Sequence, residues 1–345
     1  MENFRLTPMM TEKTLCIWSV FFLSIVCLIA VTFLDQGGKG IYAGYIVMVA
    51  FLLLKNTEMS IVRVLILSLL YANVIITLNN GFLYTDVLIP PLFSAGDEVY
   101  NQTISRAINF YGLEFVIKRP TGISDNIHVT GLLNLYFTYW LLTNRKYIQF
   151  IIVAFTILTS MNIQIILVFM IWLYKRNFKS SFNLSLLFTL AFSSAMVFLI
   201  LDYFFLEGSY FIMVVNTFSL SFTQELNYYF QIMNPIRFLF GIPANTVDDP
   251  HMNDIFAIPV TDVGFLGVPI QHGLLGVIFI VLLVLFWLRL ASPQLRIFII
   301  INLLSLVHYF PMISLPGVIV MSWLVRDSIK YKRDVNLPPS HNSGT

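Results

Sequence analysis

The sequence predicts an all-α, polytopic integral membrane protein with about ten transmembrane helices, and three observations lead to this prediction. Of the 345 residues, 58% are hydrophobic and 11% are charged, whereas soluble domains carry about 25% charged residues. Apolar runs long enough to cross ~30 Å of hydrocarbon recur along the chain. Basic residues gather in alternate connections between these runs, as the positive-inside rule requires. We therefore expect one membrane domain over 1–345.

Six apolar runs each predict one membrane-crossing helix: 14–34, 40–54, 61–78, 129–143, 184–205 and 263–288. The first run is longer than a signal-peptide core and lacks a small-residue cleavage site, so we expect a retained anchor. Two longer runs, 147–174 and 297–325, are each expected to form two short helices. The predicted breaks are Thr159–Asn162 in the first run and Pro311 with Pro316 in the second.

Charge decides how the two long runs are counted. If each long run is counted as two helices, the two chain ends lie in the cytoplasm together with fifteen of the twenty Lys and Arg residues. Counting either run as one span moves a basic cluster to the outer side. The arrangement leaves two large outer loops, about 79–128 and 206–262, and a cytoplasmic tail over 330–345. The net charge of +2 gives no indication of nucleic-acid binding.

Several site types are excluded or disfavoured by what the sequence lacks. Cys16 and Cys27 would lie about 16 Å apart on one helix, which is too far for a disulfide. No phosphate-binding loop, H-E-x-x-H or D-x-D motif is present, so an ATP-driven pump and a metal-dependent enzyme are disfavoured. No cofactor or metal is expected.

The first outer loop ends in K-R-P-T-G-I-S-D-N-I-H, which begins at Lys118 and ends at His128. Arg119 carries a planar guanidinium that can bind two phosphate oxygens at once. Asp125 or Asn126 is a candidate cap for the helix that follows, and His128 lies at the membrane interface with no role assigned. The alternative for the two cations, Lys118 and Arg119, is pairing with lipid phosphate at headgroup level.

The second outer loop supplies the remaining polar candidates: Arg237, His251, Asn253, Asp254 and Asp262. His251 is the candidate for proton transfer, because imidazole titrates near neutral pH. The alternative is a solvated loop histidine beside two acids. His272 lies inside an apolar helix, where it lines a polar cavity or hydrogen-bonds a neighbouring helix; the second role is favoured.

With these residues in view, the chain resembles the Wzy O-antigen polymerase and O-antigen ligase superfamily of bacterial inner membranes. Its layout of about ten helices with two large periplasmic loops is similar. Three segments carry the rest of the resemblance: Arg119–Gly122 with Asn126, the L-T-S-M-N break at 158–162, and F-G-I-P…H-M-N-D…D-V-G-F-L…H-G-L-L-G over 240–276. The chain departs from the family at three places. Met161-Asn162 stand where the L-T-x-S-R break has its Arg, and Pro243 stands where F-G-x-G has its second Gly. The family often has an Arg well before F-G in the second loop; here that region offers Gln224-Glu225, and Arg237 is the only arginine of the loop.

The resemblance implies a GT-C-like fold and a metal-independent glycosyltransferase of lipopolysaccharide biosynthesis. Donor and acceptor would both be oligosaccharides on undecaprenyl diphosphate, joined at the periplasmic face of the inner membrane. Arg119, with Arg237 or Lys118, would stabilise the diphosphate, and His251 would activate the acceptor hydroxyl. Implied substrate contacts are Lys118, Asn126, His128, Arg237, Asn253, Asp254, Asp262 and His272. A chain-length regulator, a flippase and membrane lipids are the candidate partners. Two alternatives stay open: an O-antigen ligase that uses lipid A–core as acceptor, and a lipid-linked oligosaccharide flippase.

Overall fold

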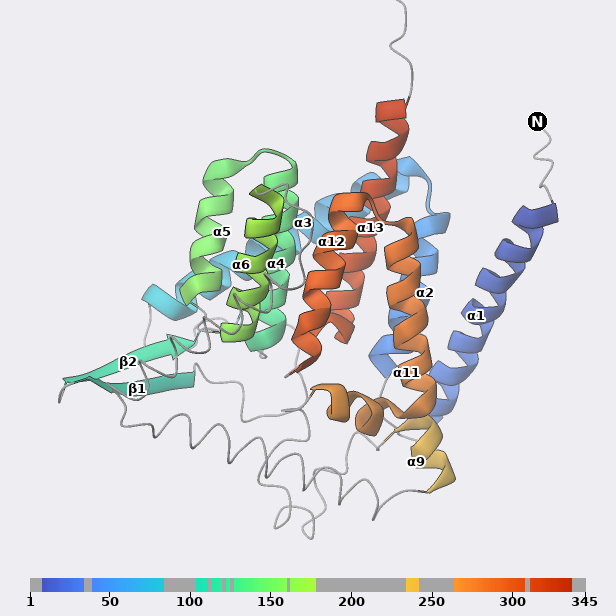
Figure 1. The fold of residues 1–345 in the computed structure, drawn as a ribbon, viewed down its shortest axis with the longest axis horizontal. Helices are drawn as coiled ribbons and strands as arrows, with labels where there is room; N and C mark the ends of the chain where they lie inside the picture. Colours follow the sequence, from blue (N-terminus) through green and yellow to red (C-terminus); the bar gives the residue numbers. More distant parts are fainter. Residues whose placement is uncertain are drawn as a thin grey trace, which may run out of the picture.

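The computed structural model describes residues 8–33, 39–83, 104–110, 113–119, 122–124, 127–159, 162–177, 234–241, 264–307 and 311–336. This part of the chain is nearly all helical, so the all-α prediction is confirmed within it (Figure 1). The long helices are α1 Pro8–Phe33, α2 Lys39–Leu53, α3 Asn56–Leu78, α4 Ile127–Thr143, α5 Tyr147–Thr159, α6 Ile163–Asn177, α11 Gly264–Leu290, α12 Pro293–Asn302 and α13 Leu315–Asn336. The short elements are η1 Asn79–Leu83, α9 Pro235–Phe240, η4 Leu303–Val307 and η5 Pro311–Ile313.

Both long apolar runs are divided into two helices, as predicted. The run 147–174 forms α5 and α6, with the break at Thr159–Asn162. The run 297–325 contains α12 and α13, separated by the 3₁₀ turns η4 and η5. Pro316 lies in the first turn of α13, where a missing amide hydrogen breaks no helical hydrogen bond. The predicted helix at 184–205 lies outside the described residues.

One β-hairpin interrupts the helical pattern and was not predicted. Strands β1 Ile104–Phe110 and β2 Leu113–Arg119 pair antiparallel, with Ile104 opposite Arg119 and Phe110 opposite Leu113. The sequence carries a signal for it, because two seven-residue runs rich in β-branched and aromatic residues flank the dipeptide Tyr-Gly. The hairpin places Lys118 and Arg119 at the end of β2, and α4 begins eight positions after Arg119, at Ile127.

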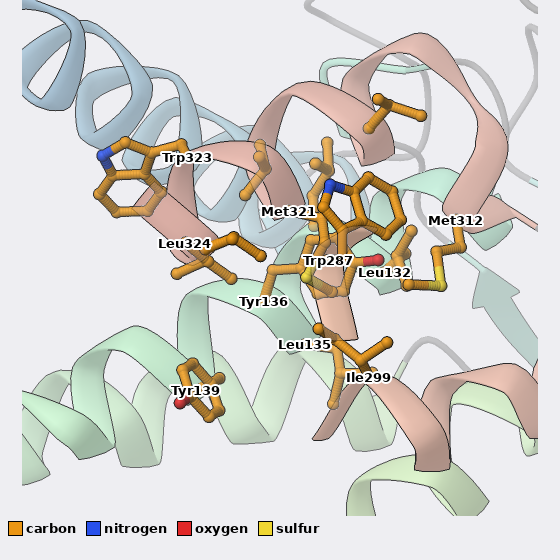
Figure 2. Packing of buried hydrophobic residues seen from close by; sticks show 14 of the residues in the cluster. Leu132, Leu135, Tyr136, Tyr139, Trp287, Ile299, Met312, Met321, Trp323 and Leu324 are labelled. Carbon is orange, nitrogen blue, oxygen red and sulfur yellow. The ribbon is translucent and has the colours of Figure 1, made fainter. Parts of the chain in front are cut away.

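Helix α4 is the centre of the bundle, since every residue from Val129 to Leu142 is buried. Aromatic side chains fill the space around it. Tyr139 lies 4.6 Å from Phe298 of α12, measured between ring centroids, and such pairs add about 0.5–1.5 kcal/mol beyond their buried area. Figure 2 shows Tyr136 of α4, Trp287 of α11 and Met321 of α13 gathered in this core.

The two ends of the bundle carry different elements (Figure 1). At the first, called the basic end, lie the α4–α5 turn, the α11–α12 connection and the end of α13. Hydrogen bonds tie it together: Arg326 Nη2 donates to the Leu54 carbonyl at 3.3 Å and Arg176 Nη2 donates to the Leu142 carbonyl at 3.2 Å. At the second, called the loop end, lie the hairpin, α9 and the α5–α6 break.

Among the described residues, two helical stretches are long and apolar enough to cross a membrane, Thr57–Gly81 and His272–Leu290. Shorter apolar stretches occupy α1, α2, α5 and α12. Large hydrophobic side chains are exposed along one face of several helices: Ile148, Ile151, Ile152 and Phe155 on α5, and Ile278, Val281, Leu282 and Leu285 on α11.

Candidate functional site

The loop that follows the hairpin is fixed to the bundle by one buried amide. Asn73 of α3 accepts the Ile123 amide hydrogen through Oδ1 at 3.0 Å. Its Nδ2 donates to Asn134 Oδ1 at 2.7 Å and to the Thr130 carbonyl at 3.3 Å. Asn73, Thr130 and Asn134 are all buried. Because buried polar groups must find partners, Asn73 holds the chain at residues 122–124 in one position against α3 and α4.

Gly122 is the residue that lets the backbone approach Asn73. A Cβ at Gly122 would lie 2.1 Å from Asn73 Oδ1, closer than any real contact. The Gly122 amide donates to Thr130 Oγ1 at 2.9 Å. Thus the Gly of the Arg119–Gly122 segment is required by packing, and Arg119 lies only three residues from this fixed point, at most about 11 Å along the chain.

His128, near the start of α4, joins the first loop to the α5–α6 break. Its Nδ1 lies 2.9 Å from Asn162 Nδ2. Asn162 Oδ1 accepts the Ile165 amide hydrogen at 3.3 Å and so caps α6. Since that oxygen is the acceptor, Nδ2 is the donor and His128 Nδ1 accepts, which leaves the proton of the neutral ring on Nε2.

Helix α9 is a single turn and a half with both ends capped. Asn234 Oδ1 accepts the Arg237 amide hydrogen at 2.8 Å, and Pro235 occupies the first helical position. The helix ends at Gly241, whose φ of 87° favours glycine and whose amide donates to the Arg237 carbonyl at 2.8 Å. The sequence N-P-I-R-F-L-F-G therefore specifies a rigid helix that carries the half-buried Arg237.

Helix α11 is broken at Gly273, where φ is 63° and ψ is −177°. A Cβ at this glycine would lie 2.4 Å from the Gly241 nitrogen and 2.6 Å from the Leu239 carbonyl oxygen. The segments Phe240-Gly241 and His272-Gly273 therefore meet backbone to backbone. The break allows α9 to pack closely against α11.

The half-buried His272 and the buried Tyr42 both lie next to Gly276, beside this break. A Cβ at Gly276 would lie 2.5 Å from the His272 Cβ and 3.9 Å from the Tyr42 hydroxyl oxygen, so both flank one glycine. Within the described residues, neither His272 Nδ1 nor the Tyr42 hydroxyl has a hydrogen-bond partner. Two polar atoms without partners in an apolar contact between α2 and α11 are costly, which is typical of a functional position.

The two groups of motif residues belong to the same end of the bundle. Gln164, just after the α5–α6 break, donates through Nε2 to the Ser305 carbonyl of η4. Element η4 in turn packs against α11. A continuous set of contacts thus leads from His128 and Asn162 to the helix that carries His272.

The structure describes some of the predicted site residues and not others. His128, Arg237 and His272 lie at the loop end, and Lys118 and Arg119 are the last residues of β2. Five predicted residues lie outside the described part of the chain: Asn126, His251, Asn253, Asp254 and Asp262. Asn73 and Tyr42 were not predicted, although an Asn inside an apolar run is itself a signal. The described residues contain no cluster of three or more His, Cys, Asp or Glu that would hold a metal ion.

No protein-family model, curated protein or solved structure matches the chain. The class of protein is therefore described from its own sequence and structure. It is a nearly all-helical protein with two membrane-length helices in its described part and a polar, glycine-dependent site at one end of the bundle.

Proposed function

We propose that this protein is a multi-pass glycosyltransferase of the bacterial inner membrane, similar to the Wzy O-antigen polymerases. It joins oligosaccharide repeat units carried on undecaprenyl diphosphate at the periplasmic face. The observation that carries the proposal is the location of the motif segments. Arg119, Gly122, Asn162, Gly241 and Gly273 all lie at the loop end. Asn162 contacts His128 at the start of α4, six residues after Gly122, and Gly241 contacts Gly273.

The exposed side chains support insertion in a membrane. On α5, Ile148 is 78% exposed, Ile151 64% and Phe155 49%. Large exposed apolar faces rarely occur on monomeric proteins in water. The cations at the opposite end, among them Arg145, Lys146 and Arg289, support a cytoplasmic position for that end. The loop end then faces the periplasm, where lipid-linked repeat units are polymerised.

The proposed reaction exchanges one glycosidic bond for another. The acceptor hydroxyl oxygen attacks the anomeric carbon of the donor chain and forms the new C–O bond. The bond from that carbon to the diphosphate breaks, and undecaprenyl diphosphate leaves with the electron pair. Arg119, with Arg237 or Lys118, stabilises the leaving charge, and His251 receives the hydroxyl proton.

The fixed backbone around Arg119 and Arg237 supports this assignment. Asn73 anchors the chain at Ile123, four residues beyond Arg119, and capped helix α9 carries Arg237 against the broken helix. Cations on preorganised backbone stabilise a developing charge better than mobile ones do. Polyprenyl tails held along the apolar helices keep the two sugars at high effective concentration.

A deletion strain tests the proposal. Loss of a polymerase leaves lipopolysaccharide capped with a single repeat unit, so the long-chain ladder on a gel disappears and the one-repeat band remains. Bare core without any repeat would instead indicate the ligase. An unchanged ladder would contradict both.

The broken helix gives specific support to the transporter alternative. Discontinuous membrane helices form the substrate sites of many transporters. In this protein α11 is interrupted at Gly273, near His272 Nδ1 and the Tyr42 hydroxyl, which have no hydrogen-bond partner among the described residues. Purified protein in detergent distinguishes the two functions, because a transporter without compartments releases no product. Lengthened glycan and free undecaprenyl diphosphate formed in detergent are expected for the polymerase.

A further inference from the structure

Two cations from different parts of the chain lie over the same indole ring at the basic end. Arg63 Cζ of α3 lies 5.6 Å from the Trp140 ring centroid, and Lys146 Nζ of the α4–α5 turn lies 5.2 Å from it. Cation–π attraction holds each charge in place. Trp140 itself is 3% exposed, and its indole N–H has no hydrogen-bond partner among the described residues.

A third cation, Arg145, is held beside Lys146 by the turn that ends α4. The Lys146 amide donates to the Leu141 carbonyl at 2.9 Å and the Arg145 amide donates to the Leu142 carbonyl at 3.3 Å. This is a Schellman motif, in which the residue at the Arg145 position takes a positive φ, here 58°. The motif leaves both side chains exposed at the end of the bundle.

These three charges have no acidic partner in the described part of the chain, where no ion pair involves Arg63, Arg145 or Lys146. Arg176 lies nearby but differs, because its Nη2 is bound to the Leu142 carbonyl. Three cations on one surface attract an anion with several acceptor oxygens, and the buried Trp140 ring holds two of them in place.

The surface next to the cations is apolar. Helix α5 begins directly after Lys146, and its exposed face presents Ile148, Ile151 and Ile152 at 78%, 64% and 46% exposure. On α3, Val64 and Leu65 beside Arg63 are 63% and 64% exposed. A ligand that contacts both the cations and the apolar face has an anionic head and long hydrocarbon chains.

We infer that Arg63, Arg145 and Lys146 form a binding site for an anionic phospholipid, whose acyl chains lie along α5, and that the Trp140 ring positions Arg63 and Lys146. Free phosphate would leave the aliphatic face uncovered, and a zwitterionic lipid brings its own ammonium group to a surface that already carries three positive charges. Basic groups between helices on the cytoplasmic side bind anionic headgroups in this way. The site rests on the membrane insertion proposed above but not on the proposed reaction, and it lies at the opposite end from the candidate active site.

Native mass spectrometry of the full chain in detergent tests the site. The protein is titrated separately with dioleoylphosphatidylglycerol, dioleoylphosphatidylcholine and inorganic phosphate. We expect phosphatidylglycerol to bind about tenfold more tightly than phosphatidylcholine, and inorganic phosphate to leave no bound species. In the double variant Arg63→Gln/Lys146→Gln the preference should fall to about onefold.

The matched control is Arg289→Gln, an exposed cation at the same end with no aromatic partner among the described residues, which should keep the preference. If the double variant does not purify as a monodisperse protein, Lys146→Gln alone carries the test and should lower the preference severalfold. Equal binding of the two lipids by the wild type would overturn the inference. An equal loss of the phosphatidylglycerol preference in Arg289→Gln would also overturn the inference, because the preference would then depend on the total charge of the protein and not on this site. Glycan lengthening in detergent is measured separately, so failure of the lipid site and failure of the proposed reaction remain distinguishable.

Discussion

Gly241 and Gly273 touch through their backbones, and a Cβ at Gly273 would lie 2.4 Å from the Gly241 nitrogen. The contact joins the end of α9 to the break in α11, two points 32 residues apart in sequence. It also explains the H-G-L-L-G segment. The first glycine allows the break, and the second, Gly276, leaves space for the His272 side chain.

Gly273→Ala should destabilise the protein by about 2 kcal/mol or more, because it adds a clash to a positive φ. Thermal unfolding in detergent measures the change. Leu274→Ala, at the adjacent and 43% exposed position, is the control and should have a much smaller effect. Equal melting temperatures for wild type and Gly273→Ala would show that α9 does not pack as described.

Asn73→Leu should cost about 2–4 kcal/mol, since the Ile123 amide and the Asn134 side chain lose their partner in a buried place. We also expect faster proteolysis within 79–128, because the loop loses its anchor. Thr77→Val is the matched control on the same buried helix face. Thr77 donates only to the Asn73 carbonyl within α3, so its loss should be small and proteolysis unchanged.

The His128–Asn162 hydrogen bond should appear as coupling in a double-mutant cycle. We expect His128→Ala and Asn162→Ala to be non-additive by about 1 kcal/mol in unfolding free energy. A parallel cycle of His128→Ala with Gln149→Ala, which bonds Tyr71 instead, should be additive. Additivity in both cycles would contradict the hydrogen bond between His128 and Asn162 that joins the first loop to the α5–α6 break.

Arg145→Gly should stabilise the protein by about 1 kcal/mol, because glycine adopts the positive φ of 58° without the steric cost of a Cβ. The measurement is the melting temperature in detergent free of anionic lipid. Asn144→Gly, one residue earlier, should be destabilising, since the Asn144 side chain donates to the Trp140 carbonyl. A lower melting temperature for Arg145→Gly would contradict the Schellman assignment.

Arg119→Ala and His251→Ala should each abolish long O-chains while single-repeat addition continues, as seen on a lipopolysaccharide gel of complemented deletion strains. Arg289→Ala, at the basic end, is the control and should restore the ladder. EDTA should leave glycan lengthening by purified protein unchanged, because guanidinium groups replace a metal in the proposal. A normal ladder from both site variants, or a strict requirement for a divalent metal, would sink the mechanism.

Apolar run length and charge placement predicted most of the described fold. The division of 147–174 follows from polar residues at Thr159–Asn162, and the division of 297–325 follows from its prolines. The β-hairpin was not predicted, because its two strands lie within the predicted outer loop 79–128, which was recognised only by its polar composition. Its period-two pattern at β2 is weak, with Val116 and Ile117 adjacent.

The site was predictable only in part, because side-chain partners depend on packing between distant segments. Asn73 and Ile123 are 50 residues apart, and no local pattern pairs them. Tyr42 and His272 both lie next to Gly276 only because α2 packs on α11. In contrast, the glycines of the motif were recognisable from sequence, since each serves a local backbone need or a close approach.

The complete enclosure of α4 has a consequence for how the chain matures. Its neighbours include α3, which precedes it, and α13, which leaves the ribosome more than a hundred residues later. Until α13 arrives, the flank of α4 that includes Trp140, partner of Trp323, has no permanent cover. Truncation before α13 is therefore expected to expose this flank of α4 and to destabilise the bundle, rather than to remove one terminal segment alone.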